Sequence, residues 1–175
     1  MVYIIKIHVD GGCRGNGQPG SIGAAAAAFK NEHGHYHTET KQALPSFPTP
    51  TNQRAELTSV ILGLEKALER YHQLNSNPWL DVTIYCDSKY AVNCLTKWVH
   101  KWSNNGWKNS EGNEVANRDL IEEAMDLEER LKEEGDVCYV WIPREENQYV
   151  DGLCNEVMDD MCNDSQSYYS SDDSC

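Results

Sequence analysis

The sequence has no run of apolar residues that approaches the roughly 18 needed to span a membrane. It also lacks a basic, serine-rich or signal-like prefix, because apolar alternation begins at about residue 3. Its seven cysteines are odd in number, scattered, and without a Cys-x-x-Cys pair, which argues against a disulfide framework or a zinc motif. These absences predict a protein with reduced thiols and no membrane partner, in the cytoplasm or the nucleus.

Positive charge is scarce. The net charge is −13, and residues 1–155 contribute 15 − 22 = −7 while residues 156–175 contribute the other −6. A chain this acidic would ordinarily repel nucleic acid. However, residues 88–110 contain no acid and four lysines, so the charge is distributed to leave a local basic stretch of +4.

The length and composition are typical of one globular domain. The chain has 175 residues, of which 39% are hydrophobic and 25% charged, enough for one sizeable core but not for two ordinary domains. Residues 163–175 are polar, acidic and repetitive, which predicts a disordered tail after a domain that covers residues 1–162. This tail either aids solubility or occupies the basic stretch within the same molecule.

Apolar periodicity predicts an α/β protein with a mixed sheet. Residues 21–30 are rich enough in alanine to form a helix, but the polar turn that follows them favours a strand in a hairpin with residues 36–40. We expect strands at 3–10, 21–30, 36–40, 80–86 and 137–142, and helices at 52–72, from 88 towards 95, 114–134 and 148–161.

Two of these strands end in a carboxylate. Asp10 follows an alternating apolar segment and precedes a glycine-rich loop, and Asp87 follows residues 80–86. If the two strands are parallel neighbours, their ends lie roughly 5 Å apart. Glu56 and Asp151, from two helices, could close on the same point. Four convergent carboxylates would need a cation, and all-oxygen ligation favours Mg²⁺ or Mn²⁺. Asp10 alone could equally be a turn residue.

Two other groups have alternative interpretations. His33, His35 and His37 would share one face of a strand, but no carboxylate or cysteine completes a metal site, which favours a solvated strand edge. Trp98 and Trp102 share a helical face and are interleaved with lysines, so they form either part of the core or a partly exposed platform.

Five motifs occur in an order and at intervals that are specific in combination. They are Asp10-Gly-Gly-Cys-Arg-Gly-Asn-Gly17, Thr51-Asn-Gln-Arg-Ala-Glu56, Asp87-Ser-Lys-Tyr90, the Trp98–Lys108 block followed by Val115-Ala-Asn-Arg-Asp119, and Asn147-x-x-x-Asp151. With these motifs the chain resembles the type 1 ribonuclease H family from about residue 3 to residue 158. The resemblance implies a ribonuclease H-like α/β fold, with a five-stranded mixed sheet and helices on both faces.

The resemblance also implies an activity and its residues. The family cleaves the RNA strand of RNA–DNA hybrids with two Mg²⁺ ions, for which Mn²⁺ can substitute, and leaves 5′-phosphate and 3′-hydroxyl ends. The implied catalytic and metal-binding residues are Asp10, Glu56, Asp87 and Asp151. The implied substrate contacts are Cys13, Asn16, Asn52 and Gln53 for the RNA strand, Tyr90, Trp98 and Trp102 for the DNA strand, and Thr51, Ser110 and Asn117 for a DNA phosphate. We expect a monomer.

Two departures from the family pattern bear on activity. The family's loop before the last aspartate usually carries a histidine, whereas residues 141–151 are shorter and have none, which predicts a changed pH dependence or a lower turnover unless Glu145 or Glu146 substitutes. Thr49-Pro50 stands where some relatives have an arginine in the phosphate pocket, which predicts weaker hybrid binding. The missing histidine makes a hybrid-binding module with little or no catalysis an alternative function. A domain derived from a retroelement polyprotein is a third possibility.

Overall fold

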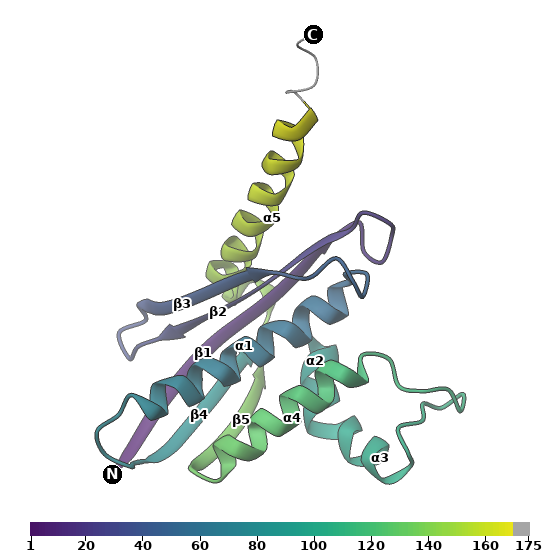
Figure 1. Cartoon of the computed structure of the whole chain (residues 1–175). Coiled ribbons are helices and arrows are strands. Elements are labelled where there is room, and N and C mark those ends of the chain that lie inside the picture. The colour runs from purple at the N-terminus through teal and green to yellow at the C-terminus, as the bar shows by residue number, and fades with distance from the viewer. Residues whose placement is uncertain (170–175) are drawn as a thin grey trace.

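A five-stranded sheet forms the centre of the molecule. The computed structural model describes residues 1–169 of the chain, with side chains through residue 166. The strands are β1 (Val2–Arg14), β2 (Ile22–Lys30), β3 (Tyr36–Ala43), β4 (Trp79–Cys86) and β5 (Gly135–Trp141). The helices are α1 (Asn52–His72), α2 (Lys89–Asn93), α3 (Val99–Asn104), α4 (Arg118–Lys132) and α5 (Gln148–Tyr169), with a π-helical turn at Cys94–Trp98 and a 3-10 turn at Arg144–Glu146 (Figure 1).

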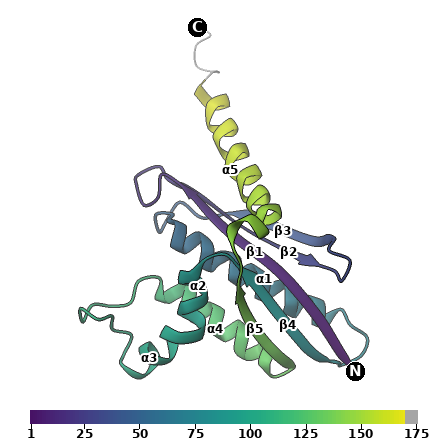
Figure 2. The ribbon, with the colours of Figure 1, turned by 180° about the vertical axis from the view of Figure 1, so that it is seen from behind.

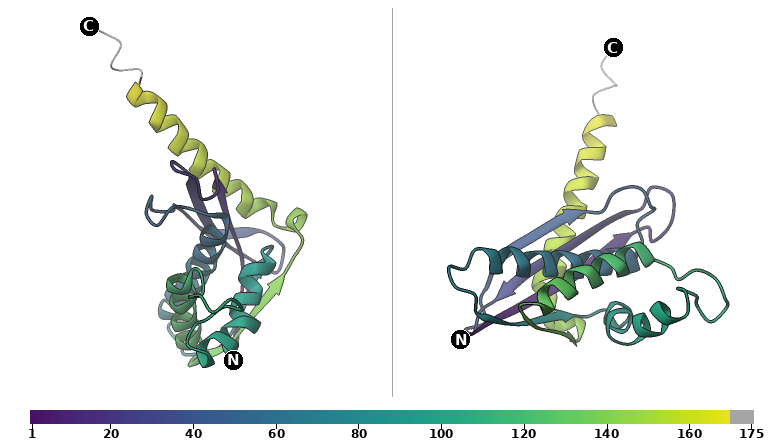
Figure 3. Two further views of the ribbon diagram at one scale, coloured as in Figure 1. Left: turned by 90° about the vertical axis from the view of Figure 1, so that its right-hand side faces the viewer. Right: turned by 60° about the horizontal axis from the view of Figure 1, so that its bottom comes forward.

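The sheet is mixed, as the sequence predicts. Its strand order is β3-β2-β1-β4-β5, with β1 parallel to β4 and β4 parallel to β5, while β2 is antiparallel to both of its neighbours. Helices α1 and α4 pack on one face and α5 lies on the other (Figure 3, left). The predicted fold, with helices on both faces of a five-stranded sheet, is therefore confirmed.

Strand β1 is longer than the sequence indicates. It does not end at Asp10 but continues to Arg14, because Gly11 and Gly12 pair with Ala25 and Ala24 of β2. The prediction that a glycine-rich loop begins directly after Asp10 was therefore wrong, and the loop starts after Arg14. The pairing with β4, in contrast, ends at Val9. Asp10 consequently lies where β1 has lost its parallel neighbour but retains its antiparallel one.

The alanine-rich segment is a strand because helices approach it from both sides. Ala25 and Ala27 belong to the core beneath α1, whereas Ala24, Ala26 and Ala28 pack beneath α5 in a second apolar cluster. Small side chains on both faces let the two helices pack close to the same strand. In Figure 2, which views the molecule from behind, α5 crosses in front of this part of the sheet.

Helix α1 matches its predicted bounds. The side chain of Thr51 caps it by accepting a hydrogen bond from the Arg54 backbone N–H at 3.1 Å. Its apolar residues, including Leu57 and Leu64, are fully buried against the sheet. Helix α4 instead begins four residues later than expected, because Glu114 pairs with Lys108 in an isolated bridge and Asn117 has a left-handed φ of 61°.

Helix α5 is longer than expected. It runs to Tyr169 instead of ending near Met161, so residues 163–169 of the predicted disordered tail are helical, and the rest of that prediction lies outside the described residues. Arg14 fastens this helix to the sheet through an ion pair with Asp159 at 2.8 Å and a hydrogen bond to Asn155 at 3.3 Å. None of the helices within residues 1–169 combines the length and apolar character that a membrane span requires.

The histidine group is not one face of a strand. His33 and His35 lie in the turn between β2 and β3, where their backbone N–H groups both donate to the Asn31 side chain at 2.9 Å. Only His37 belongs to β3. Because a turn intervenes, the alternation expected of a strand does not apply, and the predicted shared face was wrong.

Candidate active site

Four carboxylates line one cleft where the parallel pairing of the inner strands β1 and β4 ends. Asp10 comes from β1, Glu56 from the first turns of α1, Asp87 from the residue after β4 and Asp151 from the first turn of α5. The cleft has a volume of about 480 Å³. Parallel pairing of Val9 with Cys86 places the next residues, Asp10 and Asp87, side by side. The structure thus brings together the four acids that sequence order and spacing single out.

Gly11 sets the position of Glu56 relative to β1. A Cβ atom at residue 11 would lie 2.1 Å from the carbonyl carbon and oxygen of Ala55 and 2.4 Å from the backbone nitrogen of Glu56. Only glycine permits this approach of main chain to main chain. The first turns of α1 therefore rest directly on the strand, one residue beyond Asp10.

The cleft is electrostatically costly without a counter-ion. Burial, and then the charges of Asp87 and Asp151, raise the pKa of Asp10 from 3.8 to about 8. Burial, followed by the charges of Asp10 and Asp87, raises the pKa of Glu56 well above its usual range. Burial and the neighbouring charges thus favour the protonated states of Asp10 and Glu56, and a bound cation would reverse this preference.

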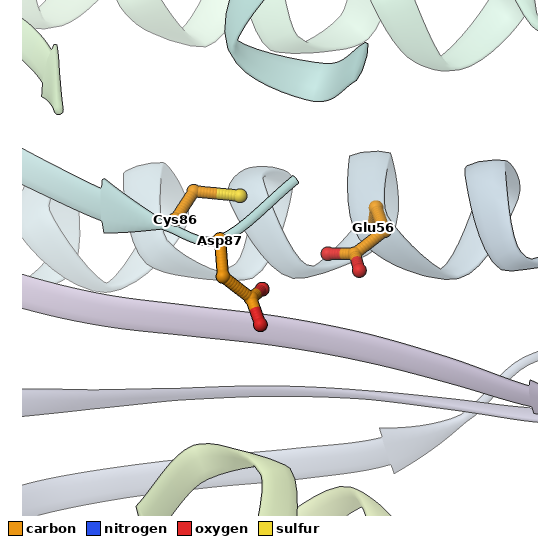
Figure 4. Close-up of side chains that lie close together, drawn as sticks. All are labelled: Glu56, Cys86 and Asp87. Carbon is orange, nitrogen blue, oxygen red and sulfur yellow. The ribbon is translucent and has the colours of Figure 1, made fainter. Parts of the chain in front are cut away.

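Two buried oxygens in the cleft have no hydrogen-bond partner among the residues that the structure describes. They are Oε2 of Glu56 and Oδ1 of Asp87. The carboxyl groups of these residues point toward one another in Figure 4. Unpartnered buried carboxylate oxygens are unfavourable in a protein interior unless another group satisfies them. Hard oxygen donors of this kind fit Mg²⁺ or Mn²⁺.

Arg144 is a residue of the cleft that sequence reasoning did not single out. It lies in the 3-10 turn before α5, and its Nη2 atom is 3.4 Å from Oδ1 of Asp151. Its charge also opposes the upward shift in the pKa of Glu56. Glu145 and Glu146 are exposed and do not line the cleft. The sequence signal for this role was a positively charged residue, Arg144, in the loop before Asp151. Its contact with Asp151 depends on the geometry of the turn, which the sequence does not show.

Asn147 fixes the same loop to the sheet. It is fully buried, and its side-chain amide donates to the Val9 carbonyl at 2.8 Å. Its Oδ1 atom lies 3.3 Å from Nδ1 of His8, whose ring stacks on Tyr85 with centroids 4.8 Å apart. Burial lowers the pKa of His8 to about 4, so this ring is neutral near pH 7. These contacts with His8 and Val9 hold the start of α5 against β1, at the two residues that precede Asp10.

Side chains predicted to contact RNA form a hydrogen-bonded group beside the cleft. The Asn52 side chain accepts from the Cys13 backbone N–H at 3.1 Å, and its own backbone N–H donates to Asn16 at 2.9 Å. Cys13 and Asn52 also line the cleft. The contacts join the loop after β1 to the start of α1.

A second polar group lies at the start of α1 and the segment before α4. The Asn117 amide donates to Gln53 at 3.3 Å and to the Tyr90 hydroxyl at 3.0 Å. Arg54 holds the same segment through an ion pair with Asp119 at 2.7 Å. Three of the predicted substrate residues are therefore in direct contact.

The tryptophans form a graded cluster. Trp98 is 39% exposed, Trp102 is partly buried and Trp107 is 8% exposed. Successive ring centroids are 5.9 and 6.2 Å apart, and Tyr90 continues the row at 6.2 Å from Trp98. Both alternatives from the sequence are therefore partly right, because Trp102 packs against the core while Trp98 presents an aromatic surface.

Within the described part of the chain, no side-chain hydrogen bond joins any two of the three residues implied for a DNA phosphate. Thr51 caps α1, and Asn117 contacts Gln53 and Tyr90. Ser110 lies exposed in the turn between Lys108 and Glu114 and makes no hydrogen bond within the described residues. The Pro50 carbonyl accepts a hydrogen bond from the Ser21 hydroxyl at 3.0 Å, which holds the segment before Thr51 against the loop after β1.

Comparisons with known proteins identify the family of this chain. A family model described as RNase H matches residues 4–164. A ribonuclease H from Hydrogenovibrio crunogenus is 37% identical over 161 residues, which cover 90% of this chain and 97% of that protein. A ribonuclease H from Erythrobacter litoralis is 33% identical over 159 residues, covering 89% and 96%. LC11-RNase H1, solved in complex with an RNA/DNA hybrid, superimposes with a TM-score of 0.63 at 25% identity and covers 90% of this chain and 99% of its own. The chain therefore belongs to the ribonuclease H family and is an endoribonuclease.

Proposed function

We propose that this protein hydrolyses the RNA strand of RNA–DNA hybrids and leaves 5′-phosphate and 3′-hydroxyl ends. The observation that carries the proposal is the cleft in which Asp10, Glu56, Asp87 and Asp151 meet, with two buried carboxylate oxygens that lack partners. Membership of the ribonuclease H family supports the substrate class. The hybrid bound to LC11-RNase H1 supports it further.

The four carboxylates fit two divalent cations, Mg²⁺ or alternatively Mn²⁺. The fit rests on the all-oxygen donor set and on the unpartnered oxygens of Glu56 and Asp87. When bound, such ions activate the attacking water and stabilise the leaving oxygen of the phosphodiester. Without a cation Asp10 and Glu56 favour their protonated forms, because burial and the neighbouring charges raise the pKa of Asp10 to about 8 and that of Glu56 well above its usual range.

The chain's own residues orient the substrate. Asn16 in the loop after β1 and Asn52 and Gln53 at the start of α1 present amide groups, suited to hydrogen bonds with the 2′-hydroxyl groups that distinguish RNA from DNA. Trp98 offers an exposed ring for the sugars and bases of the DNA strand. The lysines of residues 88–110 supply attraction to phosphates although the whole chain is acidic. We propose that a single copy of the chain suffices for these contacts.

Arg144 holds a charge where the loop histidine is missing. Its contact with Asp151 keeps the carboxylate oriented at the mouth of the cleft. An arginine stays protonated across the working pH range, so it positions groups and cannot act as a proton shuttle. We therefore expect cleavage to show no inflection from a loop histidine in its pH profile.

The test is cleavage of a labelled RNA–DNA hybrid by the wild type and Asp10→Asn in Mg²⁺, with EDTA as a further control. We expect Asp10→Asn to abolish cleavage while the fold, followed by circular dichroism, stays intact. Asp81→Asn, which removes an exposed acid of β4 away from the cleft, is the matched control and should cleave normally. Cleavage retained by Asp10→Asn would refute the proposal.

A second candidate function follows from the missing histidine. A hybrid-binding module with little turnover would bind the duplex as tightly in Mg²⁺ as in EDTA and release no fragments. The cleavage assay, combined with a binding measurement on the same hybrid, separates the two functions. Fragments with 5′-phosphate ends support the nuclease, and binding without fragments supports the module.

A further inference from the structure

We propose that Glu56, Cys86 and Asp87 form a binding site for Zn²⁺, separate in its chemistry from the all-oxygen sites proposed for Mg²⁺. One carboxylate oxygen from each acid and the thiol sulfur all lie within 4.8 Å of one another. Within the part of the chain that the structure describes, no other group of His, Cys, Asp and Glu side chains meets this criterion. Figure 4 shows the three side chains together, with Cys86 at the end of β4 and Glu56 facing it from α1.

The sulfur is fixed in place by the turn after β4. Cys86 is fully buried, and its Sγ atom accepts a hydrogen bond from the Ser88 backbone N–H at 3.4 Å. An N–H donor toward sulfur is the kind of outer contact that orients a metal-bound thiolate. The sulfur is therefore held in the apolar core, close to one carboxylate oxygen each of Glu56 and Asp87.

The two carboxylates supply an independent indication of a ligand. Oε2 of Glu56 and Oδ1 of Asp87 are buried and have no hydrogen-bond partner. A thiol proton cannot satisfy both oxygens, and a cation among the three atoms would contact both. The unpartnered oxygens and the nearby sulfur thus describe one inner pocket with two hard donors and one soft donor.

This donor set suits Zn²⁺ better than Mg²⁺. Tetrahedral Zn²⁺ places sulfur at about 2.3 Å and carboxylate oxygen at about 2.1 Å, so its sulfur and oxygen ligands lie about 3.6 Å apart. From their present limit of 4.8 Å, the sulfur and an oxygen would need to approach by about 1.2 Å at most, and the two oxygens by about 1.4 Å at most. The thiol proton passes to solvent when the metal binds. A fourth position remains for water, as in zinc sites with three protein ligands.

The proposed site shares two residues with the proposed Mg²⁺ ligands. Zn²⁺ held by Glu56 and Asp87 would therefore exclude Mg²⁺ and act as an inhibitor. This consequence rests on the proposed function, whereas the binding itself does not. The binding experiment is performed without substrate, so a failure of the nuclease assignment would leave it unaffected.

The test uses the reduced full chain, freed of metal, titrated with Zn²⁺ against a chromophoric chelator and with Co²⁺ to record thiolate-to-metal charge transfer. We expect one tight Zn²⁺ equivalent and a charge-transfer band in the wild type. Cys86→Ala should lose the band and bind Zn²⁺ at least about 100-fold more weakly, because a ligand contributes no less than the outer contacts of a metal site.

Cys154→Ala is the matched control. Cys154 is also buried and lines the cleft of the four carboxylates, but its Sγ donates to the Asp10 carbonyl at 3.2 Å. This variant should keep both the band and the affinity. Cys86→Ser, which retains the side-chain volume, guards against misfolding of the alanine variant and should also lose the band. Unchanged Zn²⁺ affinity in both Cys86 variants, or no tight binding by the wild type, would overturn the proposal.

Discussion

Asp10→Asn should stabilise the metal-free protein at alkaline pH, although it removes a central acid of the site. Asp10 is 5% exposed, and its pKa rises from 3.8 to about 8 on folding in the absence of a cation. The native state thus binds this proton more tightly than the unfolded state does. The associated stability is complete below about pH 4 and is lost as the pH rises through about 8. Asparagine is neutral throughout and escapes this loss.

The magnitude follows from the size of the shift. About four pKa units at roughly 1.4 kcal/mol each set a ceiling near 6 kcal/mol. Water entry and proton uptake by Glu56 reduce the effect, so we expect about half of the ceiling, about 3 kcal/mol, at about pH 9. The assay is urea unfolding in EDTA at a series of pH values from about 4 to 9, for the wild type and Asp10→Asn.

The difference between the two proteins should shrink to less than about 1 kcal/mol near pH 4, where Asp10 is protonated in the native state. Saturating Mg²⁺ should raise the stability of the wild type by about 3 kcal/mol at 100 times the dissociation constant, and that of the variant by less. Unfolding free energies that run parallel across the whole pH range would refute the electrostatic account of the cleft.

Two further substitutions test the aromatic cluster and the loop contact. Trp98→Ala should weaken hybrid binding by about 1–3 kcal/mol with little loss of stability, whereas Trp107→Ala should lower the free energy of unfolding by about 3–5 kcal/mol. Hybrid titration and urea unfolding measure the two effects, and equal losses of stability in the two variants would contradict the graded burial. Asn147→Ala should lower the free energy of unfolding by about 2–4 kcal/mol, because the buried Val9 carbonyl and the His8 ring each lose a hydrogen-bond partner. A decrease below about 1 kcal/mol, measured by thermal unfolding, would contradict this role of Asn147.

The fold was largely predictable because local signals agreed with tertiary ones. Thr51 caps α1 where the apolar periodicity begins, and β4 ends directly before Asp87 as its apolar run indicates. The extension of β1 past Asp10 could not be predicted, because Gly11 and Gly12 ordinarily end a strand. They continue it here because β2 offers a partner strand of alanines, and such pairing is a long-range property.

The candidate site was predictable only where chain order carries information. Strand-end carboxylates and family motifs indicated the four acids and the amides near them. Arg144 and Cys86 carry no comparable signal, because an arginine in a loop and a buried cysteine are each common. Their relation to Asp151 and Glu56 arises from turn geometry and from packing between β4 and α1. Residue type alone does not encode either relation.

The contact between Gly11 and the backbone of Ala55 makes the spacing of the acids a property of the main chain. If side chains in the core beneath α1 change in volume, the backbone contact at Gly11 still limits how closely the start of the helix can approach β1. We therefore expect substitutions in the apolar interior to leave unchanged the closest approach of α1 to the strand that carries Asp10. For protein engineering, residue 11 is accordingly a poor choice for substitution, whereas buried positions such as Leu64 offer scope for redesign that leaves the cleft untouched.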